Sequence, residues 1–83
     1  MSSPNQIKER IDVLARFDQN GVTPLLFKHR ERTIKIEAID LKYVSKSGAI
    51  SFYNFHVSTK TASYKICYNN QSLHWVLEEI STA

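Results

Sequence analysis

The sequence predicts an all-β protein: a six-stranded antiparallel meander that forms a closed or half-open small barrel. Residues 49–77 contain three runs in which polar and apolar residues alternate, and this period of two is typical of half-buried strands. Short polar segments of hairpin length separate the runs. The alternative is an N-terminal helix packed on a five-stranded antiparallel sheet. In either case the 83 residues, 42% of them hydrophobic, are enough for one core and form a single domain, 1–83.

The three runs direct their large apolar side chains to one face, which we expect to be the interior. The predicted inner residues are Tyr53, Phe55, Tyr64, Ile66, Trp75 and Leu77. Turns centred on 59–60 and on 70–71 would align them as the rows Tyr53–Ile66–Trp75 and Phe55–Tyr64–Leu77. A second turn centred on 69–70 keeps the same face but shifts the pairs, so both registers stay open.

The N-terminal part is more ambiguous. We expect residues 1–8 to be a flexible terminus. Between residues 7 and 17, the spacing of Ile7, Ile11 and Leu14 fits a helix. The strict alternation from Ile11 to Phe17 instead favours a strand from about Arg10. The choice between helix and strand stays open here, although we prefer the strand.

Turn signals divide the rest of this half. The clearest turn is Asp18-Gln19-Asn20-Gly21, in which Asn-Gly supplies the positive φ that a type I′ hairpin needs. A strand over 22–29 follows. Pro24 cannot donate to a ladder, so this strand is an edge or is open at that point. A long strand over 33–43 comes next. Its apolar phase flips near Ala38, which predicts a bulge or bend.

Composition limits the functional classes. One cysteine excludes an internal disulfide and suits a reducing, cytoplasmic location. No apolar run approaches the roughly 18 residues that span a membrane, and the N-terminus lacks the apolar core of a signal peptide. We therefore expect no membrane association.

The charge pattern suggests a contact surface. The net charge is +3, and no acid occurs between Asp40 and Glu78. Lysines and histidines within that block give a positive potential, which suits nucleic acid as one partner. Lysines on strands also simply protect edges. The candidate contacts with nucleic acid or a partner are Lys42, Lys46, Phe52, Lys65 and His74.

Catalytic and metal motifs are poorly represented. The carboxylates show no pairing for acid–base chemistry, and there is no Gly-flanked nucleophile and no phosphate-binding loop. Cys67 opposite His74 is the one pairing to consider as a nucleophile or half of a metal site, but no spacing motif supports it. A second cluster, His29-Arg30 with Arg32, is either a phosphate contact or a solvated turn. We expect no enzymatic activity, metal or cofactor.

A family resemblance is carried by Phe17, the turn through Gly21, the run 24–27, the cationic turn that follows it, the apolar strand with Ile34 and Ile36, and Trp75. These residues resemble the opening "aromatic-acid-x-x-Gly … Pro-Leu-x-Phe" and the Trp-containing last strand of small uncharacterised bacterial proteins. The sequence departs from that pattern at His29, where an aromatic residue is frequent, and in its longer last turn, 69–72. The resemblance implies an all-β fold and no activity. Some members are similar to accessory proteins of DNA-repair polymerases, which adds to the nucleic-acid hypothesis by analogy only.

Two functional hypotheses follow. The first is a non-enzymatic protein-interaction module, whose exposed strand edges bind another protein or a second copy of the chain. The alternative is a nucleic-acid-binding small β-barrel.

Overall fold

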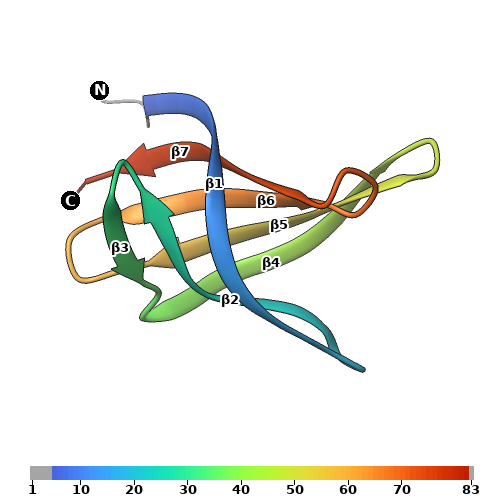
Figure 1. The fold of residues 1–83 in the computed structure, drawn as a ribbon, viewed down its shortest axis with the longest axis horizontal. Coiled ribbons are helices and arrows are strands. Elements are labelled where there is room, and N and C mark those ends of the chain that lie inside the picture. The colour runs from blue at the N-terminus through green and yellow to red at the C-terminus, as the bar shows by residue number, and fades with distance from the viewer. Residues whose placement is uncertain (1–4, 83) are drawn as a thin grey trace.

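A computed structural model describes residues 5–82, which form seven β-strands and no helix. The strands are β1 (Asn5–Asp18), β2 (Gly21–His29), β3 (Arg32–Lys35), β4 (Ala38–Ser47), β5 (Ile50–Ser58), β6 (Ser63–Asn69) and β7 (His74–Ser81). Their order in the sheet is β3-β2-β1-β7-β6-β5-β4, and all neighbours are antiparallel. The sheet curls into an open half-barrel, with β3 and β4 as its two edges (Figure 1). The all-β prediction is thus confirmed, while the strand count is seven rather than six.

The N-terminal helix of the alternative prediction is absent from the described residues, because β1 runs from Asn5 to Asp18. Ile7 and Ile11 are four residues apart, and this even spacing also fits one face of a strand. The strand is nevertheless irregular between them. Its register against β7 shifts between Gln6 and Glu9, and Lys8 has a φ of 57°. Of the terminus expected to be flexible, residues 1–4 lie outside the described part, whereas residues 5–8 belong to β1.

The extra strand arises at the predicted bend. The long strand expected over 33–43 is divided at Ile36 and Glu37 into β3 and β4. The Ile36 N–H donates to the Leu25 carbonyl of β2 (3.1 Å), and the Glu37 N–H donates to the Ser58 carbonyl of β5 (2.9 Å). This link therefore ties β2 to β5 at one end of the half-barrel, although β3 and β4 do not pair.

Strand β1 connects the two halves of the fold. Its first half pairs with β7, from Asn5↔Ile80 to Ile11↔Trp75, and its second half pairs with β2. As a result, β1 and β2 cross the inner side of β4–β7 (Figure 1). Two edge-to-face ring contacts mark this packing: Phe27 with Tyr64, with centroids 5.0 Å apart, and Phe17 with Tyr68, 5.6 Å apart.

The core lies between these layers and contains the predicted inner face. Phe55, Ile66 and Leu77 are fully buried, Tyr64 and Trp75 are buried, and Tyr53 packs against them. The observed rows differ from the predicted ones by two residues: Tyr53–Tyr68–Trp75 and Phe55–Ile66–Leu77. A shift of two keeps every side chain on its face, so the composition of the core was predicted correctly while the pairing was wrong.

The first hairpin turn differs in type from its prediction. It spans Asp18–Gly21 as expected, but its central residues, Gln19 and Asn20, lack the positive φ values of a type I′ turn. Gly21 follows with a φ of 111°, and Asp18 Oδ1 accepts a hydrogen bond from the Asn20 N–H. Pro24 behaves as predicted: β3 pairs with β2 only from Leu26 onward, so Pro24 has no partner strand on that side.

Candidate functional site

Strand β4 is the longer open edge of the half-barrel. It has ten residues and pairs only with β5, whereas the other edge, β3, has four. All its side chains except that of Ile39 are exposed. Three of the exposed ones are large and apolar: Leu41 (51%), Tyr43 (39%) and Val44 (48%). Since alternate backbone N–H and C=O groups of an edge strand point away from its neighbour, β4 presents both apolar side chains and unused hydrogen-bonding groups.

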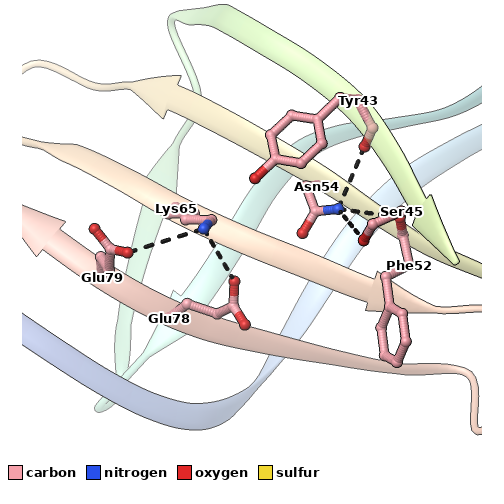
Figure 2. A network of polar contacts seen from close by, with 7 residues as sticks. All are labelled: Tyr43, Ser45, Phe52, Asn54, Lys65, Glu78 and Glu79. Atoms are coloured by element: carbon pink, nitrogen blue, oxygen red, sulfur yellow. Dashed lines mark hydrogen bonds and ion pairs between the residues drawn. The ribbon is translucent and has the colours of Figure 1, made fainter. Parts of the chain in front are cut away.

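A buried amide holds β4 against β5. Asn54 lies opposite Tyr43 and is only 6% exposed. Its Nδ2 donates to the Tyr43 carbonyl (3.4 Å), to Ser45 Oγ (3.1 Å) and to the Phe52 carbonyl (3.1 Å) (Figure 2). Two of these bonds hold the middle of β4 from its paired side, that of β5, so the exposed edge is an ordered surface.

A charged cluster lies next to this amide on the outer face. Lys65 Nζ is 3.9 Å from carboxylate oxygens of both Glu78 and Glu79, and Tyr43 lies on the same side (Figure 2). Burial alone would lower the pKa of Lys65. The Tyr43 hydroxyl and the two carboxylates outweigh it and raise the pKa above its ordinary value. The sequence between Asp40 and Glu78 contains no acid, but in the folded protein β7 brings Glu78 and Glu79 next to Lys65.

The five predicted contact residues do not form one patch. Phe52 pairs with Asn69, which in turn pairs with His74, so Phe52 and His74 end one outer row. Lys65 belongs to a different outer row, beside His56. Lys42 and Lys46 lie opposite Phe55 and Ser51, and Lys42 therefore shares the face of the core residue Phe55. The structure thus separates two lysines from the other three residues.

The pairing of Cys67 with His74 is not formed. Cys67 lies opposite Asn54 on one side and Val76 on the other. The thiol is buried, and that burial, reinforced by Glu78, raises its pKa to about 11. Near neutral pH the group therefore stays a protonated thiol, which is the unreactive form.

The cationic turn is partly neutralised. Arg30 donates to Glu9 Oε1 at 2.7 Å, and His29 Nε2 lies 3.1 Å from Glu9 Oε2. The hydrogen bond from Arg30, together with the charges of Arg30 and His29, lowers the pKa of Glu9. Arg30 and Glu31 both have positive φ values, so this turn is the type I′ turn of the fold.

A second surface feature lies where β1 separates from β7. A shallow groove of about 430 Å³ is lined by Phe17, Tyr68, Leu73 and Trp75 among others. Leu73 is 66% exposed and has a φ of 62°. A branched side chain in this left-handed conformation is strained. Tyr68 and Trp75, in contrast, are buried, so their rings are not free platforms for stacking bases.

Sequence reasoning missed the exposed apolar residues of β4. It placed Leu41 and Tyr43 in a long bent strand without assigning them to an edge. The available signal was that apolar residues occupy both phases of a run that also carries Lys42 and Lys46, a mixture that is uncommon in strands with one buried face.

Comparison of the chain with protein-family models, curated proteins and solved structures found no match. Within residues 5–82 there is no cluster of three or more His, Cys, Asp or Glu side chains placed to share a metal ion. The same residues include no helix with the length and apolar character needed to cross a membrane.

Proposed function

We propose that this protein is a non-enzymatic interaction module that binds an extended segment of a partner protein along the open edge of β4. The observation that carries the proposal is β4 itself, a ten-residue strand paired on one side only, with Leu41, Tyr43 and Val44 exposed. Strand addition to such an edge gains affinity from backbone hydrogen bonds and specificity from alternate side chains. The Asn54 bonds support it further, because an edge that is already ordered loses less entropy on binding.

The alternative, a nucleic-acid-binding barrel, has less support. Lys65 is engaged by two glutamates, and the remaining lysines of the predicted set lie on another face. This hypothesis stays a prediction. A titration with single-stranded and duplex nucleic acid at low salt tests it, since phosphate contacts would make any binding strongly salt-dependent.

The decisive experiment is a selection of linear peptides against the protein, followed by NMR mapping. We expect the selected peptides to shift or protect backbone amides of β4. The double variant Leu41→Ser/Val44→Ser removes one half-exposed apolar group from each face. It should weaken binding by about 2 kcal/mol, or roughly thirty-fold in Kd. Because both side chains are half exposed, the variant should remain folded.

Leu14→Ser provides the matched control. Leu14 is an exposed apolar residue of β1, away from β4, so its loss should leave the affinity unchanged. Perturbations that map to other strands, or equal weakening by the β1 and β4 variants, would refute the assignment of the binding site.

A further inference from the structure

The side chains of β4 carry a specific charge pattern on the inner side of the edge. Lys42, Val44 and Lys46 alternate along the strand and lie opposite Phe55, Tyr53 and Ser51. They therefore share one face, with an exposed apolar group between two cations. None of the ion pairs formed by residues 5–82 includes either lysine. The two charges are thus available to a strand that pairs with β4.

A second copy of the chain fits this pattern poorly. Two β4 strands related by a two-fold axis would place lysine opposite lysine in the registers centred on Lys42 and on Val44. The register centred on Tyr43 places Lys46 opposite Asp40 of the other copy, but it gathers the lysines of both copies on one face. Like charges in opposed positions destabilise a strand pair. Asp40, the only acid of β4, already accepts hydrogen bonds from Ser58 Oγ at 2.9 and 3.1 Å.

Pairing of β4 with the other edge of a second copy is also unfavourable. Strand β3 has only four residues, and its two charged side chains, Arg32 and Lys35, are both basic. The chain as a whole carries a net charge of +3. The pattern is instead complementary to a strand that carries an acid, an apolar residue and an acid at alternate positions.

We propose that the occupant of the β4 edge is an acidic extended segment of a partner protein. Its carboxylates lie opposite Lys42 and Lys46, and an apolar side chain lies opposite Val44. This inference rests on the proposed function. The partner's intervening side chains face the other side of the sheet, where Leu41 and Tyr43 offer apolar contacts. Charge complementarity of this kind selects the partner and fixes its register more than it adds affinity.

The test uses synthetic peptides with the full chain. One peptide carries two glutamates four residues apart, the spacing of Lys42 and Lys46. Valine stands midway between the glutamates, at the position opposite Val44, and tyrosine occupies the positions on either side of the valine. Two others have lysine or glutamine in place of the glutamates. Binding is followed by fluorescence anisotropy and by the NMR shifts of β4 amides. Exposed ion pairs of this type are worth about two- to fivefold in affinity each, so the glutamate peptide should bind about tenfold tighter than the glutamine peptide.

Charge reversal provides the sharpest comparison. Lys42→Glu/Lys46→Glu should lose the preference for the glutamate peptide and gain one for the lysine peptide. Lys60→Glu, in the exposed loop between β5 and β6, is the control for a change in overall charge and should preserve the original order. Folding of each variant is checked by the dispersion of its amide spectrum. If the double variant does not fold, the single variants and Lys42→Gln serve the same comparison.

Each outcome has a distinct meaning. Binding at β4 that ignores peptide charge would overturn the acidic partner and leave the proposed function standing. Concentration-dependent dimerisation with protected β4 amides would identify a second copy as the occupant and overturn the inference in the same way. If peptides of every charge leave β4 unperturbed, the proposed function fails as well.

Discussion

Replacement of Asn54 should loosen the edge strand before the rest of the fold. Its two amide hydrogens are shared among three oxygen acceptors at 3.1–3.4 Å, so Asn54 contributes at most two hydrogen bonds. At about 0.5–1.5 kcal/mol net for each bond, Asn54→Ala should lower the free energy of unfolding by about 1–3 kcal/mol. The total for a domain of this size is roughly 4–12 kcal/mol, so the loss is a substantial fraction.

Asn54→Asp makes the same prediction sharper, because it keeps the shape and removes both donors. The new carboxylate would face carbonyl oxygens in a buried site, so its pKa in the folded state should lie above the unfolded value of about 3.9. The destabilisation that ionisation causes is then absent below the unfolded pKa, grows as pH rises between the two values and is complete above the folded one. Stability relative to the original protein should therefore recover on acidification.

Urea unfolding followed by the fluorescence of Trp75, the only tryptophan, measures the global effect. Hydrogen exchange of the β4 amides measures the local one. Asn70→Ala is the control, since Asn70 Oδ1 accepts one hydrogen bond, from the Ser51 N–H, in an exposed turn. The reasoning is refuted if Asn54→Ala costs no more than that control, or if the substitution accelerates exchange of the β4 amides no more than that of the β6 amides.

Three further predictions concern other parts of the molecule. Leu73→Gly should raise the free energy of unfolding by about 0.5–1 kcal/mol in urea, because glycine relieves the positive φ; an unchanged midpoint would contradict this. Cys67 should react with a thiol reagent at pH 8 far more slowly in the native protein than in urea, because its pKa is about 11; equal rates would show that the thiol is accessible. Arg30→Gln should move the pKa of Glu9 upward toward its ordinary value of 4.5, as followed by NMR titration. The stabilisation that this contact gives is present above that value and is lost as pH falls through the lowered folded pKa, and no change in the titration would mean that Arg30 does not hold the carboxylate.

The core was predictable because side-chain alternation depends only on the local pleat. Phe55 and Leu77 are buried because the alternation of polar and apolar residues places both on the inner face. The all-β class follows from the same periodicity. The strand pairing depends on the turns, which the alternation does not encode. Thr59 Oγ1 accepts from the Ala62 N–H and donates to the Ala62 carbonyl, and Asn69 Oδ1 accepts from two N–H groups of its turn. These bonds lengthen both turns and move each register by two.

The candidate site was less predictable because edges are a property of topology. No local pattern indicates that β1 will pair with β7 and so leave β3 and β4 as the ends of the sheet. The neutralisation of Lys65 has the same origin, because Glu78 and Glu79 reach it only through the pairing of β6 with β7. Charge read along the chain therefore overstated the positive potential of the outer face.

The adjacency of β1 and β7 also has a kinetic consequence. Contact between Asn5 and Ile80 closes a loop that spans nearly all of the described chain. The chain loses the entropy of that closure before the contact can stabilise it. The hairpins between neighbouring strands can form early and independently, whereas the seam between first and last strands must come late. We therefore expect refolding on the millisecond-to-second scale of non-local β topologies. A circular permutant that joins the two termini directly would turn this seam into a local hairpin and should fold faster.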